Sequence, residues 1–474
     1  MNAIALAFAG LAGFIPMALL LFFVALLQQL AKDALSVVDA LLSMAPEESK
    51  LPLVESRTQR LMMSLVKALG LFLVLGFGVY VLGWVAPIFI SDILKLPIAT
   101  VQFNGTHWMV LSLGASLPFF WLSTRKKHSA YSPLAQLFHH LILDSPNLGM
   151  RLFRREVKKW KRGHSLDDHA PFLIVTGLAR AGTTSLLNGL QASGAFASLH
   201  YGYMPFLLSP GTWSRWYRPV NTMKKERSHG DGVQVGLAST EALEEYFFSA
   251  QADYVEAESL KEYNLSPKQV EQYAQYRALV LAVQGDKKTY LAKNNNAILR
   301  YASLSKQAPG MVMAVLFRHP LYHAASLAEM HLRFTALQTE DPFVLTYMDW
   351  LGHHEFGKHM KGFDFADGTQ MAQGDPLKID TWLHRWTGYY QRVLALHNHQ
   401  MHIIEYDRFC TQPGAVIAAL NSQLGNKTPA IAIVPHQNTR PTPEGADPII
   451  LAEALHVYGA LKALQMPMED GPYL

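Results

Sequence analysis

Apolar residues are concentrated in the first 125 positions, where three stretches are candidates for membrane-spanning segments. Residues 1–30 contain no charged side chain, and residues 4–27 can cross a hydrocarbon core of roughly 30 Å. They lack the basic n-region of a signal peptide, so we predict a spanning helix. Residues 68–90 form a second predicted span, whose glycines are tolerated in lipid. Residues 107–122 are short and contain Pro118, so they form either a third span or a re-entrant or surface helix.

Beyond position 165 the pattern changes to short apolar runs that alternate with helical stretches. Residues 172–176, 311–315 and 401–406 are typical of buried parallel strands, and residues 343–357, 382–399 and 413–424 of helices. This alternation predicts an α/β domain, with a central parallel sheet and helices on both faces. We therefore expect a transmembrane helical region at 1–125, a basic juxtamembrane linker at 126–165 and an α/β domain at 166–474.

The distribution of charge predicts the orientation in the membrane. Only 16% of residues are charged and 50% are apolar, which is a low charge content for a wholly soluble enzyme. Lysine and arginine are enriched in residues 31–67 and again in residues 125–127 and 151–162, but not in residues 91–106. The positive-inside rule places both basic segments in the cytoplasm. We expect a multi-pass protein of the inner (cytoplasmic) membrane with a cytoplasmic catalytic domain.

The single cysteine and the net charge narrow the range of functions. Cys410 alone excludes an intrachain disulfide and a cysteine zinc site, and it is compatible with a reducing compartment. The net charge of +4 follows from the basic juxtamembrane residues and gives no indication of nucleic-acid binding. We expect neither a metal cofactor nor a nucleic-acid partner.

A glycine-bounded turn follows the apolar run 172–176. Gly177 and Gly182 enclose it, and a helix then opens with Thr183, Thr184 and Ser185. Backbone N–H groups and the positive end of the helix dipole converge at such a turn, which makes an anion site. The glycine spacing is that of a Walker A loop, but Thr183 replaces the lysine that a nucleoside triphosphatase needs. The cation of this loop is Arg180 instead.

A second candidate anion site follows the apolar run 311–315. Arg318 comes after the strand, Pro320 opens a helical pattern and Ser326 lies on that helix. An arginine at a strand end can bind a phosphate in a bidentate manner, and a hydroxyl on the next helix adds a donor.

The two segments together resemble the PAPS-dependent sulfotransferases, whose donor is 3′-phosphoadenosine 5′-phosphosulfate (PAPS). The sequence GLARAGTTS fits the loop G-x-x-[R/K]-[S/A/G]-G-T-[T/S], which binds the 5′-phosphosulfate in that family. The resemblance implies binding by Gly177, Arg180, Ala181, Gly182, Thr183, Thr184 and Ser185. Arg318, Pro320 and Ser326 match the family's 3′-phosphate motif R-x-P-x5-S. The resemblance covers roughly residues 170–425 and implies that residues 166–474 form a sulfotransferase domain with a P-loop-like fold.

Candidates for the catalytic base lie between the two motifs. His229 belongs to a His-Gly-Asp-Gly element followed by S-x-E-x-x-E-E, as in a bacterial membrane-associated branch of the family. His229 is the first candidate because an unperturbed histidine side chain titrates near neutral pH, and Glu245 or Glu244 is the second. Acids at a helix start also act as ordinary dipole partners, so the glutamates have a structural alternative. His200 is the third candidate.

Two further residues are assigned by position. Lys293 resembles the family's lysine at a strand end, so we expect it to face the sulfate or the acceptor; a polar turn is the alternative. Arg440 belongs to a late loop, residues 436–445, that can close over the nucleotide.

The resemblance implies in-line transfer of a sulfuryl group from PAPS to a hydroxyl, with Arg180 stabilising the leaving group. The predicted membrane anchor indicates a lipid, glycolipid or saccharide precursor as the acceptor. Two other functions remain open: a P-loop kinase or nucleoside triphosphatase, which needs Mg²⁺, and a non-catalytic nucleotide-sensing membrane protein.

Overall fold

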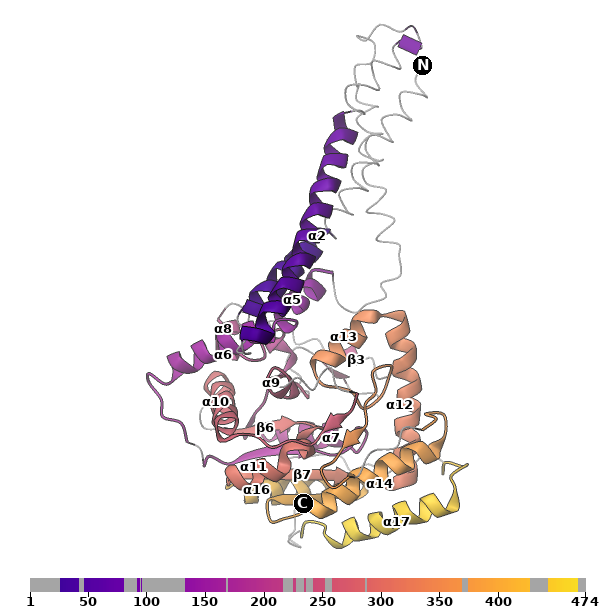
Figure 1. Cartoon of the computed structure of the whole chain (residues 1–474). Coiled ribbons are helices and arrows are strands. Elements are labelled where there is room, and N and C mark those ends of the chain that lie inside the picture. The colour runs from indigo at the N-terminus through magenta and orange to yellow at the C-terminus, as the bar shows by residue number, and fades with distance from the viewer. Residues whose placement is uncertain are drawn as a thin grey trace. The chain divides into compact units, whose positions relative to one another are not determined.

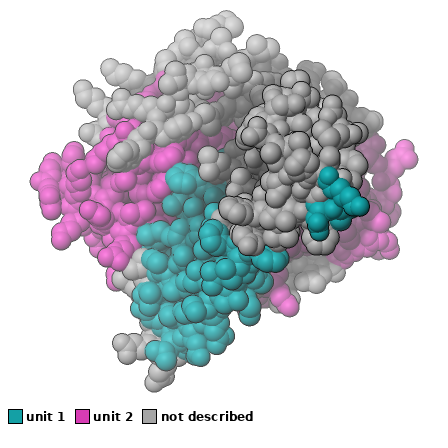
Figure 2. Space-filling model, turned by 90° about the horizontal axis from the view of Figure 1, so that it is seen from above, with its two compact units in different colours: residues 1–148 teal, residues 149–474 magenta. Residues whose placement is uncertain are grey.

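The computed structural model describes residues 26–41, 47–80, 92–93, 95, 133–167, 169–215, 225–226, 234–235, 242–251, 258–285, 288–368, 374–426 and 442–467. The chain divides into two compact units, residues 1–148 and 149–474, which Figure 2 shows in different colours. The predicted three-part division at residues 125 and 165 stays a prediction.

The described part of the first unit is helical. It contains helical residues 26–41, α2 (Glu47–Tyr80) and α5 (Pro133–Leu143). The buried carboxylate of Asp39 accepts hydrogen bonds from the backbone N–H of Leu148, at 3.0 Å, and from the side chain of Asn147. These two residues belong to the first turn of α6 (Pro146–Trp160). Asp39 thus satisfies a free donor at a helix N-terminus, where negative charge is favourable.

The predicted membrane spans fall largely outside the described residues. Residues 4–25 and 107–122 belong to none of the described ranges, and the predicted span 68–90 is described only as far as Tyr80, where α2 ends. None of the described helices combines the length and the apolar character that a membrane crossing requires. The spans and the membrane location stay predictions.

The second unit is built around a five-stranded sheet with the order β2–β6–β1–β7–β9. Its strands β6 and β7 are labelled in Figure 1. All neighbouring strands of this sheet are parallel, as predicted. The strands are β2 (Phe196–Ala197), β6 (Thr289–Lys293), β1 (Phe172–Thr176), β7 (Met311–Phe317) and β9 (Met401–Glu405). In a parallel sheet all carboxyl ends lie at one edge, so the loops after β1, β6 and β7 meet there.

Helices cover both faces of this sheet, which confirms the predicted layers. On one face, Leu173 and Leu316 belong to an apolar cluster with residues of α7 (Thr183–Ala192) and α16 (Pro413–Gln423). On the other face, Phe172 meets Tyr273 of α10 (Pro267–Gln284), with ring centroids 5.9 Å apart. Phe317 meets Tyr390 of α14 (Ile379–Leu396) in the same way. The alternation of side chains along each strand explains the two apolar layers.

The basic segment 151–162 forms most of α6, which is amphipathic. Phe153 and Val157 are buried, while Arg151, Arg155 and Lys158 are exposed. Phe153 contacts the rings of Phe247 and Tyr276 within the second unit. The apolar side of this helix is therefore part of the core of that unit.

Proline begins many of the remaining helices, since its missing N–H is not needed in the first turn. The predicted helix 343–357 is wrong at its end: the helix stops at Trp350, and Gly352 has a left-handed φ of +67°.

The other helices are α8 (Pro210–Trp213), α9 (Glu245–Ser249), α11 (Tyr301–Gln307), α12 (Pro320–Glu340), α13 (Pro342–Trp350), α15 (Tyr406–Thr411) and α17 (Pro448–Ala463). Short 3₁₀ turns are η3 (Tyr201–Tyr203) and η5 (Ala297–Arg300), and short strand pairs are β3 (Lys225–Glu226) with β4 (Gln234–Val235) and β5 (Leu260–Lys261) with β8 (Phe363–Asp364).

Candidate active site

The glycines of the loop between β1 and α7 are required by close packing. A Cβ at Gly177 would lie 2.5 Å from the carbonyl oxygen of Leu316, at the end of β7. A Cβ at Gly182 would lie 2.1 Å from the ring of Tyr406. Both glycines also have positive φ, of 141° and 95°. Within this loop the backbone N–H of Ala181 donates to the carbonyl of Leu178 at 3.1 Å.

The loop ends at a helix start without a side-chain cap. Gly182 is the N-cap residue of α7 and has no side chain with which to bond the N–H groups of the first turn. Thr183 is buried, Thr184 is half-buried and Ser185 is exposed. N–H groups and hydroxyls at a helix N-terminus attract an anion. The predicted anion loop therefore has the expected strand–loop–helix geometry.

Arg180 connects the two predicted motifs. Its φ is +72°, a left-handed conformation that costs a non-glycine residue roughly 1–2 kcal/mol. Its Nε donates to the buried hydroxyl of Ser326 on α12, with the two atoms 3.3 Å apart. Two segments separated by 146 residues thus form one site. A cation held at the cost of backbone strain indicates a function.

His323, which the sequence analysis did not select, supports this loop. The indole N–H of Trp386 donates to its Nδ1 at 3.2 Å, so the proton of the ring lies on Nε2. Nε2 then donates to the carbonyl oxygen of Ala179 at 2.7 Å. Burial lowers the pKa of His323 to about 3, and the charges of Arg318 and Arg180 act in the same direction. The imidazole is therefore a permanently neutral support directly before Arg180.

Arg318 lies at the carboxyl end of β7 and is buried. Its guanidinium carbon is 5.4 Å from the ring centroid of Tyr406, the first residue after β9. Burial and the neighbouring Cys410 raise the pKa of Tyr406 to about 12, although Arg318 and Ser185 act in the opposite direction. Tyr406 thus remains a neutral ring that contacts residues of both motifs. The signal for it in the sequence is its position after an apolar strand.

Lys293 reaches the anion loop from the neighbouring strand. It is the last residue of β6, and its Nζ donates to the hydroxyl of Thr184 at 3.0 Å. The structure therefore brings Lys293 together with the first turn of α7, on the side of β1 opposite to β7.

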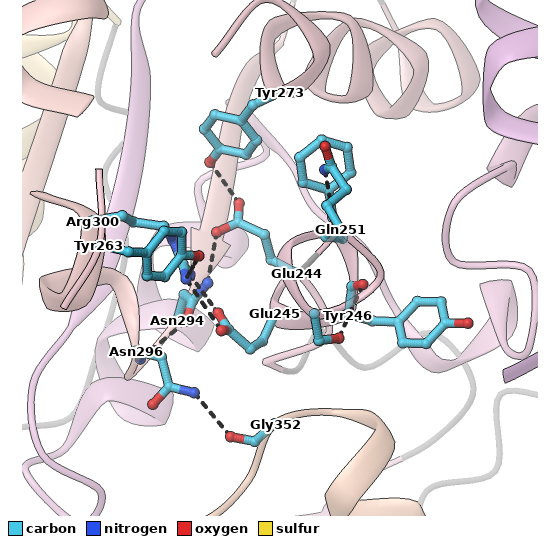
Figure 3. Close-up of polar contacts among 12 residues, drawn as sticks. Glu244, Glu245, Tyr246, Gln251, Tyr263, Tyr273, Asn294, Asn296, Arg300 and Gly352 are labelled. Carbon is cyan, nitrogen blue, oxygen red and sulfur yellow. Dashed lines mark hydrogen bonds and ion pairs between the residues drawn. The ribbon is translucent and has the colours of Figure 1, made fainter. Parts of the chain in front are cut away.

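The two predicted glutamates lie in a buried polar network (Figure 3). The carboxylate of Glu245 accepts hydrogen bonds from both terminal nitrogens of Arg300, which is 1% exposed. Glu244 accepts from the hydroxyls of Tyr273 and Tyr290, each at 2.7 Å, and from the amide of Asn294 at 3.0 Å. Burial and the charge of Glu244 raise the pKa of both tyrosines, so they stay protonated and donate.

These contacts favour a structural role for both glutamates. A base must offer a lone pair to the acceptor hydroxyl, whereas both oxygens of Glu245 already bind Arg300. Removing one partner of such a buried pair is strongly destabilising. The role of Glu245 as a base stays a prediction, and the structural alternative gains support from this geometry.

The two predicted histidines differ in what can be described. His200 follows β2, its Nδ1 accepts from the N–H of Gly202 at 3.1 Å, and its ring stacks on Tyr203. His200 therefore caps the short turn η3, and its role as a base stays a prediction. His229 and Arg440 lie outside the described residues.

The turn after β6 is clamped by the loop after α13. The side-chain amide of Asn296 donates to the carbonyl of Gly352 at 2.9 Å, and that of Asn295 donates to Glu355 at 2.7 Å. Burial raises the pKa of Glu355, but contacts from His353 and Asn295 outweigh it and lower the value to about 2. Glu355 is therefore ionised at any physiological pH. The sequence around Gly352 and Glu355 carries no recognisable motif.

Among the described residues, no group of three or more His, Cys, Asp or Glu side chains is placed to hold a metal ion.

The sequence matches no family model and no curated protein. Three similar solved structures are sulfotransferase STF1 from Mycobacterium tuberculosis H37Rv, a sulfotransferase from Alicyclobacillus acidocaldarius and sulfotransferase STF9 from Mycobacterium avium. Their identities are 14%, 16% and 12%, with TM-scores of 0.39, 0.31 and 0.34. The alignments cover 67%, 62% and 74% of this chain and 82%, 97% and 81% of the other chains. At these values the similarity carries no argument about activity.

Proposed function

We propose that this protein transfers a sulfuryl group from PAPS to a hydroxyl of a membrane-associated acceptor. The observation that carries the proposal is the contact of Arg180 with Ser326, which joins the predicted 5′-phosphosulfate loop to the predicted 3′-phosphate motif. A donor with phosphate groups at both ends of its ribose needs two such anion sites at a fixed separation. A nucleoside triphosphatase needs the Walker lysine, which Thr183 replaces.

The residues of the site match the chemistry of this donor. The first turn of α7 offers backbone N–H groups and hydroxyls to the 5′-phosphate, beside Arg180 and Lys293. Arg318 and Ser326 offer a guanidinium and a hydroxyl to the 3′-phosphate. Tyr406 supports the site from the end of β9.

In the proposed reaction the acceptor oxygen attacks sulfur while the bond from sulfur to the 5′-phosphate oxygen breaks. The bond electrons leave with adenosine 3′,5′-bisphosphate, and the hydroxyl proton passes to a base of the chain. Arg180 and Lys293 stabilise the charge that develops on the leaving phosphate. Removing one such donor costs about 10²–10³-fold in rate.

The membrane-associated acceptor rests on the N-terminal sequence. The predicted spans and the basic segments next to them would hold the catalytic unit at the cytoplasmic face of the inner membrane. Tethering raises the effective concentration of the enzyme near a lipid, glycolipid or lipid-linked saccharide.

The experiment is transfer of ³⁵S from labelled PAPS to a bacterial lipid extract by the detergent-solubilised full chain without Mg²⁺. We expect labelled lipid with the wild type and an about 10²–10³-fold lower rate with Arg180→Ala. Arg155→Ala, a change at an exposed arginine of α6, is the matched control and should retain the rate. Hydrolysis of ATP that depends on Mg²⁺ would instead favour a kinase or nucleoside triphosphatase. Binding of the bisphosphate without any transfer would favour a nucleotide sensor.

A further inference from the structure

We propose that His353 is the general base of the transfer reaction and that Glu355 orients its imidazole. This inference rests on the proposed function and names the residue that removes the acceptor proton. It is carried by the loop after α13, which places a half-exposed histidine and a buried carboxylate beside the turn that follows β6.

The loop is held firmly at the sheet edge. The bonds from Asn296 to Gly352 and from Asn295 to Glu355 attach it on both sides of His353. The backbone N–H of His353 also donates to the carbonyl of Met348 at 2.9 Å. Gly352 packs so closely that a Cβ there would lie 2.5 Å from Cγ of Glu245. A base must be held by such supporting contacts to act at a defined position.

The two side chains differ as expected for a general base and the group that orients it: the imidazole of His353 is partly exposed, and the carboxylate of Glu355 is buried. Nδ1 of His353 lies 3.8 Å from Oε1 of Glu355, an ion-pair distance that can shorten when substrate binds. The side chain of His353 is 22% exposed and that of Glu355 is 7% exposed. A carboxylate facing Nδ1 favours the tautomer with the proton on Nδ1. Nε2 then offers its lone pair to a substrate.

The position of this pair relative to the donor site follows from the chain. Asn295, which binds Glu355, is two residues after Lys293, and Lys293 contacts Thr184 of the anion loop. The pair therefore lies at the carboxyl edge of β6, next to the strand that carries the anion loop. Ligands of parallel α/β sheets bind at this edge.

Nearby acids and histidines are less suited to accept a proton. Glu244 and Glu245 are buried and bound to donors. His354 is 1% exposed, and its Nδ1 contacts the carbonyl of His359 at 3.1 Å. Burial lowers the pKa of His354 to about 4. His353 and His359 both combine exposure with a carboxylate partner, but Glu355, the partner of His353, is the one bound to the turn after β6.

The step balances without a further reactant. The acceptor oxygen forms its bond to sulfur, and its proton passes to Nε2 of His353. The sulfur–oxygen bond to the 5′-phosphate breaks, and the leaving bisphosphate keeps the electron pair. The resulting imidazolium is stabilised by the carboxylate of Glu355 and returns its proton to water.

The test compares two acceptors in the full chain, with His353→Gln against the wild type. At slightly alkaline pH the hydroxyls of octyl glucoside are not ionised, whereas 4-nitrophenol is largely ionised and needs no base. We expect His353→Gln to lose about 10²–10⁴-fold in transfer to octyl glucoside and less than about ten-fold in transfer to 4-nitrophenol. Glu355→Gln should show an intermediate loss with the same difference between acceptors.

His359→Gln is the matched control, because His359 is an exposed histidine of the same loop that contacts Asp349. It should keep wild-type rates with both acceptors. Binding of adenosine 3′,5′-bisphosphate should be unchanged in all three variants, which shows that they fold. Equal losses with both acceptors, or no loss in His353→Gln, overturn the role of His353 and leave the proposed function standing. Failure of the wild type to bind the bisphosphate or to sulfate either acceptor overturns both.

Discussion

The charged side chains on the two sides of β1 have different kinds of partners. On the β7 side, Arg180 donates to a hydroxyl, and Arg318 lies near an aromatic ring. On the β6 side, Glu245 and Arg300 neutralise each other, and Glu244 accepts from two tyrosines and an asparagine. Donor groups gathered at strand ends beside a helix N-terminus suit an anion, whereas a buried bidentate ion pair holds packed elements together. The pair of Arg180 and Ser326 is suited to binding an anion, and the network of Glu244 and Glu245 to stabilising the fold.

The difference explains why charged residues in neighbouring motifs need not share a role. Glu244 and Glu245 belong to the same resemblance as His229, but their contacts are those of a buried core network. Arg180 adopts an unfavourable backbone conformation, and its hydrogen bond to Ser326 links it to the second predicted anion motif. We therefore expect substitutions in the network of Glu244 and Glu245 to lower stability, and substitutions of Arg180, Arg318 or Ser326 to lower donor binding.

The largest effect is expected for Glu245→Ala. It leaves Arg300 buried without its carboxylate, which should lower the free energy of unfolding by about 3–5 kcal/mol. Urea denaturation followed by circular dichroism measures this change. Glu271→Ala is the control, because its ion pair with Lys161 is exposed and worth at most about 1 kcal/mol. A stable Glu245→Ala protein that lacks only transfer activity would contradict the structural role of Glu245 and favour its role as a base.

Acid should weaken the loop that carries His353. Glu355 has its pKa lowered from 4.5 to about 2, so it contributes stability above pH 4.5 that is lost as the pH falls towards 2. The difference corresponds to about 3 kcal/mol. Denaturation midpoints at pH 6 and pH 3 in the wild type and in Glu355→Gln separate this contribution. An identical acid response in the two proteins would contradict the assignment of Glu355.

A smaller effect is expected from His323→Phe. The change keeps the size of the ring but leaves the carbonyl of Ala179 and the indole of Trp386 without their partner, at a cost of about 1–3 kcal/mol. Because Ala179 precedes Arg180, binding of adenosine 3′,5′-bisphosphate should weaken as well. Calorimetric titration of the folded variant measures it. Unchanged binding would show that the loop does not depend on His323.

The smallest effect is expected from Ser326→Ala. It removes one hydrogen bond to Arg180, so bisphosphate binding should weaken by about 2–10-fold with little loss of stability. Ser305→Ala on α11 is the matched control, because the hydroxyl of Ser305 donates to the carbonyl of Ala302 within its own helix, and binding should be unchanged. If Ser326→Ala lowered the free energy of unfolding by more than the free energy of bisphosphate binding, Ser326 would have a structural role and not a binding role.

The parts of the site that the sequence predicts are those formed by consecutive residues. The loop from Gly177 to Ser185 needs only a strand, a tight turn and a helix, all of which the local pattern contains. The parallel sheet follows in the same way from short apolar runs. Residues whose role depends on distant partners were missed: His323 needs Trp386, and His353 needs Glu355, which Asn295 holds from another strand end.

Glu244 and Glu245 are the opposite case: their local sequence pattern is clear, but it does not reveal their partners. An acidic pair at a helix start has a plain local explanation, and the partner of Glu245, Arg300, lies 55 residues further along the chain. No local pattern specifies such a contact, because it depends on how the strands and helices pack.

The most direct test of the account is binding of adenosine 3′,5′-bisphosphate and of ADP to the detergent-solubilised chain, with and without Mg²⁺, in the wild type and in Arg318→Ala. The account predicts tighter binding of the bisphosphate, no need for Mg²⁺ and loss of the preference in Arg318→Ala, since Arg318 is assigned to the 3′-phosphate. Equal or tighter binding of ADP, or a strict need for Mg²⁺, would contradict it.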